Sequence, residues 1–252
     1  MCLSLFNTPS FADDSCIGDC INGQGTFTVP DGSKYEGGWK NGKYDGRGVL
    51  TLSDGGKYEG EWKDGKSEGE GIFSASNGGK YEGGWKNGEW NGQGTFISPD
   101  GNKYEGSLKN GKFEGRGTMT FLNGGKYEGD WKNGNIEGKG TMTSGGKKYI
   151  GEWKDGKRDG QGIETFPDGS KYVGKYKNSQ WEGQGTLTDP SGNKYQGEFK
   201  NDKFDGQGIF ASLNGARYVG KFKNGVPDGQ GTLTKPDGTI IKGEFKNGQP
   251  PQ

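Results

Sequence analysis

Aromatic, glycine and charged positions recur along this chain with a fixed period. Tyrosine stands at position 35 and returns in steps of 23 residues, with one step of 22, until isoleucine takes its place. These positions are Tyr35, Tyr58, Tyr81, Tyr104, Tyr127, Tyr149, Tyr172, Tyr195, Tyr218 and Ile241. Such a period is typical of proteins in which one supersecondary unit is stacked many times. It defines nine full units over residues 35–240, a partial unit over 16–34 that we expect to cap the array, and a partial unit and tail over 241–252.

Each unit contains the signature of a tight β-hairpin. Asn41-Gly42 is typical of a two-residue type I′ turn, in which both central residues need positive φ. A turn of this length fixes the register of the flanking strands. We therefore expect Lys40 opposite Lys43 and Trp39 opposite Tyr44. Counting on without interruption, Gly37 would meet Gly46, Glu36 would meet Arg47, and Tyr35 would meet Gly48.

The period of two in a strand separates these residues onto two faces. One face carries the aromatic residues and the glycines, including Tyr35, Trp39, Tyr44 and Leu50. The other carries charged residues such as Glu36 and Arg47, which this register would pair across the strands. A lone hairpin is marginal in water, so the aromatic faces must be buried by stacking. The fold class predicted is all-β: an elongated single-layer antiparallel sheet of tandem hairpins, curled into a trough.

The composition agrees with a regular β-structure and excludes some partners. Glycine supplies 55 of 252 residues and only 26% of residues are hydrophobic, yet 12% are aromatic, which disordered chains lack. The 33 basic and 33 acidic residues give a formal net charge of zero. Nucleic-acid binders normally carry a basic excess on one face, so we predict no nucleic-acid partner.

Catalytic motifs are weak. Gly60–Ser67 reads GEWKDGKS, which fits the phosphate-binding pattern G-x-x-x-x-G-K-[ST], but that loop works only between a strand and a helix, and sister copies show a hairpin. The chain has no histidine, the commonest general base and metal ligand. Carboxylates such as Glu36 and Asp45 repeat in every unit, which favours surface charges over a catalytic pair. We predict no enzyme activity, no catalytic residue, no metal and no cofactor.

The N-terminal segment leaves several alternatives open. Residues 1–15 are either a disordered terminus or a signal-peptide remnant, because Ser10-Phe11-Ala12 fits the end of a cleavage site. If residues 1–12 are a signal remnant the protein is periplasmic or secreted, and otherwise it is cytoplasmic. Cys16 and Cys20 are four residues apart, so a local disulfide and two unpaired thiols are both open.

The repeat resembles the MORN family. The clearest copy, YEGEWKDGKSEGEGIFSASNGGK from Tyr58 to Lys80, is similar to the family pattern YEGEWKNGKxxGxGxxxxxDGxx. The segment CIGDCINGQGTF from Cys16 to Phe27 is more loosely similar to the N-terminal cap of stand-alone bacterial MORN proteins. The resemblance implies scaffolding, membrane attachment or dimerisation, and we expect a scaffold or protein-interaction protein with an unknown protein partner. Monomer and homodimer both stay open, with Pro250-Pro251 blunting the last edge.

The candidate binding residues are the large aromatic side chains of the trough. They are Trp39, Tyr44, Trp62, Trp85, Trp90, Trp131, Trp153 and Trp181. They either form only the core of the sheet or also bind a ligand at its rim. Alternatives to a protein partner are a membrane phospholipid and a glycan or peptide held in the trough. One repeat deviates from its siblings, because Glu164 stands where others have Phe73, Phe96 or Met119.

Overall fold

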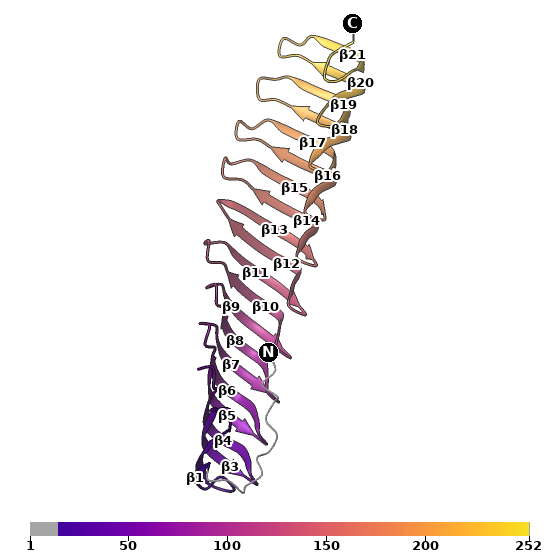
Figure 1. Ribbon diagram of the computed structural model, residues 1–252. Helices are drawn as coiled ribbons and strands as arrows, with labels where there is room; N and C mark the ends of the chain where they lie inside the picture. Colours follow the sequence, from indigo (N-terminus) through magenta and orange to yellow (C-terminus); the bar gives the residue numbers. More distant parts are fainter. Residues whose placement is uncertain (1–14, 252) are drawn as a thin grey trace. The chain divides into compact units, whose positions relative to one another are not determined.

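The computed structural model describes residues 15–251, and these residues fold into antiparallel β-hairpins. The predicted all-β, open sheet of tandem hairpins is confirmed. The chain divides into two compact units, unit 1 (residues 1–124 and 130–135) and unit 2 (residues 125–129 and 136–252). In each unit, successive hairpins follow one another in sequence order (Figure 1).

The strands of unit 1 pair only with their sequence neighbours among the described residues. They are β1 (Cys16–Gly18), β2 (Gln24–Thr28), β3 (Lys34–Lys40), β4 (Lys43–Thr51), β5 (Lys57–Lys63), β6 (Lys66–Ser74), β7 (Lys80–Lys86), β8 (Glu89–Ile97), β9 (Lys103–Lys109) and β10 (Lys112–Thr120). Strand β11 (Lys126–Lys132) contributes residues to both units.

Unit 2 repeats the same arrangement. Its strands are β12 (Asn135–Ser144, whose first residue belongs to unit 1), β13 (Lys147–Lys154), β14 (Lys157–Thr165), β15 (Lys171–Lys177), β16 (Gln180–Thr188), β17 (Lys194–Lys200), β18 (Lys203–Ala211), β19 (Arg217–Lys223), β20 (Val226–Thr234) and β21 (Ile240–Phe245).

The hairpin turn is as predicted, but the register beyond it is not. Asn41 and Gly42 have φ of 50° and 72°, and Trp39 lies opposite Tyr44. The next pair is Gly37 with Gly48, so three residues of β4 face one residue of β3. Gly46, with φ of 86°, lies in this bulge. The predicted pairs Gly37–Gly46, Glu36–Arg47 and Tyr35–Gly48 are therefore wrong.

The bulge shifts every later pair by two residues. Tyr35 lies opposite Leu50, and Glu36 lies opposite Val49. Glu36 instead forms an ion pair with Lys34 at 3.0 Å, while Arg47 lies opposite Glu61 of the next hairpin. The same bulge recurs from hairpin to hairpin, because a glycine at the Gly46 position supplies the positive φ each time.

Each repeat tyrosine packs against two glycines, and its hydroxyl forms a hydrogen bond with a backbone carbonyl group at the bulge. Tyr35 is fully buried and stacks on Tyr44 with ring centroids 3.7 Å apart. Its hydroxyl donates to the carbonyl of Gly38, the β3 residue inside the bulge, at 3.0 Å. A Cβ added to Gly48 would collide with the Tyr35 ring and hydroxyl. The glycines are therefore required where the ring lies directly on the backbone.

The tryptophans join one hairpin to the next. Trp39 Nε1 donates to the carbonyl of Gly25 at 3.1 Å, and Trp62 Nε1 donates to that of Gly48 at 3.3 Å. Trp62 also contacts Tyr35 edge-on, with ring centroids 5.4 Å apart. Aromatic pairs of this geometry add stabilisation beyond the area that they bury. The core of each unit is thus a continuous aromatic layer on one face of the sheet.

Replacing Gly48 with alanine is expected to destabilise unit 1 by about 1–3 kcal/mol, because the new methyl group must displace the buried Tyr35 ring. Gly46→Ala is the matched comparison, since its Cβ would meet no atom within 4 Å and only the positive φ opposes it. Chemical denaturation of both variants separates the two effects. Unchanged stability of Gly48→Ala would contradict the close contact between the Tyr35 ring and Gly48.

Candidate functional site

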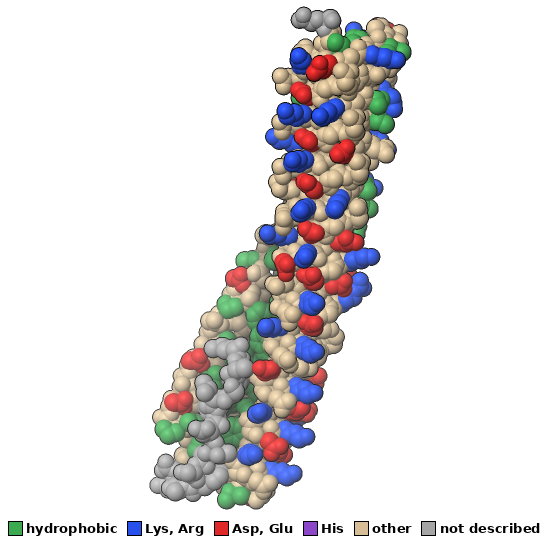
Figure 2. Space-filling model, turned by 90° about the vertical axis from the view of Figure 1, so that its right-hand side faces the viewer, with side chains coloured by type: hydrophobic (Ala, Val, Ile, Leu, Met, Phe, Trp, Pro, Cys, Tyr) green, Lys and Arg blue, Asp and Glu red, His purple; other side chains and the backbone are tan. Residues whose placement is uncertain are grey.

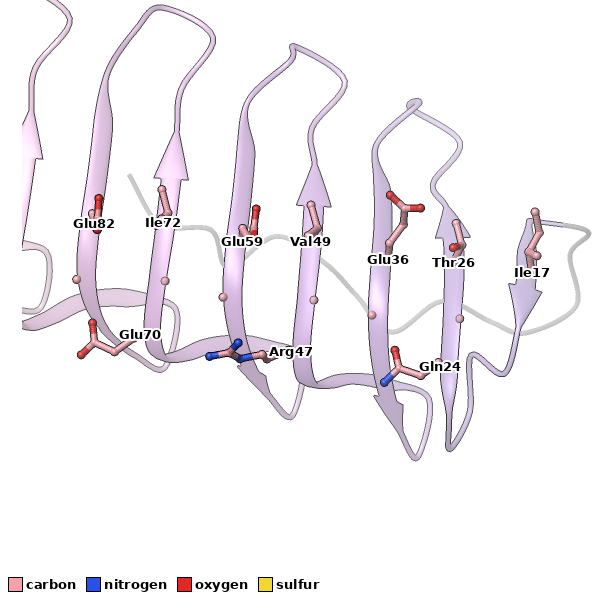
Figure 3. A pocket seen from close by; sticks show the side chains of 16 residues that line it. Ile17, Gln24, Thr26, Glu36, Arg47, Val49, Glu59, Glu70, Ile72 and Glu82 are labelled. Carbon is pink, nitrogen blue, oxygen red and sulfur yellow. The ribbon is translucent and has the colours of Figure 1, made fainter.

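A groove of about 820 Å³ runs across the strands of unit 1 on the face opposite the aromatic layer. Its floor is a row of glycines from neighbouring strands: Gly25, Gly37, Gly48, Gly60, Gly71 and Gly83. The Cβ directions of Gly48 and Gly71 point at the tyrosines behind them. The groove side of this row is therefore bare backbone, as Figure 3 shows.

The two walls of the groove differ in chemistry. One wall, here called the long wall, alternates carboxylates with small or apolar side chains and consists of Thr26, Glu36, Val49, Glu59, Ile72 and Glu82. The other, the short wall, consists of Gln24, Arg47 and Glu70. In Figure 3 the two rows lie on either side of the glycine row. Bare backbone between polar and apolar side chains is suited to an elongated ligand.

The carboxylates of the long wall are paired but exposed. Glu36, Glu59 and Glu82 each bind the lysine two residues earlier in their own strand, at 3.0, 3.0 and 3.1 Å. Their side chains remain 53–61% exposed. Exposed ion pairs contribute little to stability, so a ligand cation can replace the lysine at small cost.

Unit 2 presents a different row at the equivalent positions. In the first strand of each hairpin, the position that glutamate holds in unit 1 is held by Ile150 in β13 and by Val173 in β15. Ile163 of β14 lies between these two residues and is opposite both of them. These three side chains are 45%, 41% and 37% exposed, respectively. Across β13, β14 and β15 the outer row is therefore apolar where the long wall of unit 1 has carboxylates, so this part of unit 2 lacks the acidic wall of the groove.

The aromatic residues predicted to bind a ligand lie in the core layer. Trp39, Tyr44, Trp62, Trp85, Trp131 and Trp153 are buried, with 4–8% of their surface exposed. Trp90 and Trp181 are only partly buried, and each stacks on a repeat tyrosine with ring centroids 4.5 and 4.4 Å apart. A binding role for these aromatic residues stays a prediction, and it would depend on the surface that Trp90 and Trp181 keep.

Buried tyrosines of the aromatic layer have raised pKa values. Burial raises the pKa of Tyr44 to about 12, and burial with the nearby Glu114 raises that of Tyr104 to about 12.

The carboxylate of Glu114 accepts a hydrogen bond from the backbone N–H of Asn133 in the next hairpin turn, at 2.9 Å. Acidic residues at this repeat position therefore connect adjacent turns, a role that their periodicity alone did not reveal.

Charged side chains of both signs are interspersed over the molecular face shown in Figure 2. This distribution agrees with the formal net charge of zero. Long-range attraction to a polyanion needs a concentrated basic surface, which this face does not have.

One repeat of unit 2 carries a polar cluster in the aromatic layer. Arg158 stands at the position where Tyr44 and Phe113 stack on the repeat tyrosine of their own hairpins. Its guanidinium lies 5.6 Å from the centre of the Tyr149 ring. It binds Glu164 at 2.6 Å, and Glu164 also accepts the Tyr176 hydroxyl at 3.0 Å. The hydroxyl of Tyr176 in turn accepts the Trp181 indole N–H at 3.1 Å. The two deviations from the repeat, Arg158 and Glu164, therefore compensate each other.

The phosphate-loop match, Gly60–Ser67, covers the end of β5, a two-residue turn and the start of β6, so no helix N-terminus follows it in this segment. A disulfide bond joins Cys16 and Cys20, whose Cα atoms are 6.3 Å apart. Residues 15–251 include no helix long and apolar enough to cross a membrane. The signal-remnant hypothesis concerns residues 1–12, which lie outside the described part of the chain.

Repeated hairpins with a shared aromatic layer define a tandem β-hairpin repeat protein. Ten consecutive matches to the MORN repeat cover residues 21–34, 35–57, 58–80, 81–103, 104–126, 127–146, 149–171, 172–194, 195–217 and 218–240. The chain therefore belongs to the MORN-repeat family. No significant match was found among curated proteins.

Two solved structures show a distant likeness. One is the TCP domain of SAS-4 (dCPAP) of Drosophila melanogaster in complex with a proline-rich motif of Ana2 (dSTIL); it has 16% identity and a TM-score of 0.39, covering 62% of this chain and 85% of that one. The other is a mutant TCP10 domain of Danio rerio CPAP, with 15% identity and a TM-score of 0.39, covering 88% and 98%. Likeness at this level carries no conclusion about function.

Proposed function

We propose that this protein is a non-catalytic interaction scaffold and that the groove of unit 1 binds an extended segment of a partner protein. The observation that carries the proposal is the bare glycine floor, which crosses β2 to β7 without a side chain on the groove side. A ligand backbone can lie directly on such a surface.

The chemistry of the groove supports binding over catalysis. Glu36, Glu59 and Glu82 occupy equivalent positions with equivalent lysine partners, so none is singled out by its environment. General acid–base catalysis needs individual groups placed within hydrogen-bond reach of the reacting atoms. A repeated, exposed row is instead suited to contacting a ligand at several points along its length.

Blocking the groove tests the proposal. Peptides selected from a random display library on the full chain are expected to lose binding by roughly tenfold or more when Ile72, a wall residue with 38% of its surface exposed, is replaced with tryptophan. A bulky ring at this position fills the groove without entering the core. Peptide affinities are measured by fluorescence anisotropy.

The matched control is Ile163→Trp in unit 2. Ile163 occupies the same repeat position and is 37% exposed, but it lies outside the groove lining. Selected peptides should bind this variant as they bind the unchanged protein. Failure to select any peptide, or equal binding to both tryptophan variants, would overturn the proposed function.

A further inference from the structure

The groove of unit 1 has a repeat distance that limits what kind of chain can follow it. Equivalent residues, such as Glu36, Glu59 and Glu82, lie two strands apart. Neighbouring strands are about 4.7–4.9 Å apart, so the carboxylates of the long wall recur every 9.4–9.8 Å, approximately. A ligand lying along the groove meets the same side chain at this interval.

A polyproline II helix matches this distance. It rises about 3.1 Å per residue with three residues per turn, so every third side chain returns to the same side after about 9.3 Å. A β-strand repeats its face after about 6.6–6.8 Å. Two turns of an α-helix advance about 10.8 Å, an excess that accumulates over successive carboxylates. Of these three regular conformations, polyproline II keeps register with Glu36, Glu59 and Glu82.

The charges and the apolar side chains specify the ligand further. Three of the four glutamates in the groove lining are held only by exposed lysines, which cations of a ligand can displace at small cost, so a ligand with regularly spaced cations can pair with them. Val49 and Ile72 lie between the glutamates of the long wall, where they can contact proline rings or other apolar groups. On the short wall, Arg47 and Gln24 are donors for ligand carbonyl groups, which a polyproline II helix leaves unpaired.

We propose that the groove of unit 1 binds a polyproline II segment that carries a lysine or arginine at every third position. This inference rests on the proposed function and names the ligand class for the same groove. Grooves that bind proline-rich chains are usually lined by aromatic residues, whereas this one is lined by carboxylates and aliphatic groups. Ion pairs therefore supply the selectivity, and the affinity falls as salt is added.

The test compares synthetic peptides on the full chain by fluorescence anisotropy. Four repeats of Arg-Pro-Pro are expected to bind roughly tenfold tighter than four repeats of Arg-Pro-Pro-Pro, because the longer spacing loses two or more ion pairs. Four repeats of Arg-Gly-Gly keep the charge spacing but not the conformation and should also bind more weakly. Four repeats of Glu-Pro-Pro should not bind.

Matched variants locate the interaction. Glu59→Gln with Glu82→Gln removes two carboxylates of the long wall, and binding of the Arg-Pro-Pro peptide should fall roughly tenfold. Glu105→Gln with Glu128→Gln makes the same change at sister positions outside the groove lining, where each glutamate also pairs with a lysine, and binding should be retained.

The outcomes separate this inference from the proposed function. Equal binding of the two arginine–proline spacings, or equal loss in both glutamine variants, would overturn the ligand class. If library peptides still depend on Ile72 but lack periodic cations and prolines, the scaffold function stands and the polyproline II ligand is wrong. If no library peptide depends on Ile72, the proposed function itself fails.

Discussion

Raising the pH from about 10 to about 12 is expected to unfold this protein in a steep transition, because buried tyrosines must stay protonated in the fold. Ten tyrosines have raised pKa values, with burial the largest cause in each: Tyr35, Tyr44, Tyr58, Tyr81, Tyr104, Tyr149, Tyr172, Tyr176, Tyr195 and Tyr218. For Tyr44, Tyr104 and Tyr149 the raised value is about 12.

The sign of the effect follows from which state releases protons. Unfolded tyrosines ionise above about pH 10, while the folded ones stay neutral, so the unfolded state is favoured as the pH rises. Each buried tyrosine lowers the free energy of unfolding by about 1.4 kcal/mol per pH unit in this range. Several acting together exceed the 5–15 kcal/mol that typically separates folded from unfolded states.

Circular dichroism and tyrosinate absorbance, followed together, check this expectation. The two signals should change at the same pH. Tyr44→Phe is the matched variant, since phenylalanine stands at the equivalent positions 113 and 204, where it stacks on the repeat tyrosine in the same way. Its transition should be shallower and shifted to higher pH. Gradual tyrosine ionisation near pH 10 with the sheet intact would contradict the burial of these hydroxyls.

Breaking the Arg158–Glu164 pair is expected to cost about 3–5 kcal/mol, toward the lower end because the Arg158 side chain is 26% exposed. Glu164→Leu leaves the guanidinium among Tyr149 and Tyr176 without its carboxylate. Arg158→Phe leaves Glu164, only 7% exposed, without its cation. Each single variant should therefore destabilise unit 2.

Replacing both residues together is expected to restore most of the stability. The double variant Arg158→Phe with Glu164→Met recreates the combination found at Phe113 and Met119. Hydrophobic replacement of a buried ion pair is often neutral or stabilising. A double-mutant cycle by chemical denaturation measures the coupling. Additive losses in the double variant would show that the two residues act independently.

The sequence predicted the hairpin and its aromatic face correctly because both depend on local rules. Asn41-Gly42 specifies a type I′ turn, and the alternation from Trp39 to Tyr35 assigns the faces. The bulge was missed because Gly46 and Gly48 look alike in sequence. Only the closed hairpin shows that Gly46 takes positive φ while Gly48 lies under the Tyr35 ring.

The groove could not be predicted for a related reason. The sequence assigned Glu36 and Arg47 to one charged face, and both do line the groove, but from opposite walls. A period of two shows which side of a strand a residue occupies. It does not show how the backbone bends at the glycines that separate Glu36 from Arg47. The Arg158–Glu164 pair is visible in the sequence, because two residues of opposite charge replace the usual apolar residues on one strand. They are six residues apart and therefore lie on the same face.

Pairing between sequence neighbours has a consequence for how the protein is made. Among the described residues of unit 1, each strand pairs with the preceding or following strand, so these strand pairings do not wait for a distant part of the chain. Ribosomes add about 5–20 residues per second, whereas a hairpin closes in about 1–10 μs. Each repeat can therefore dock on the previous one before the next is translated, and folding proceeds at the pace of synthesis.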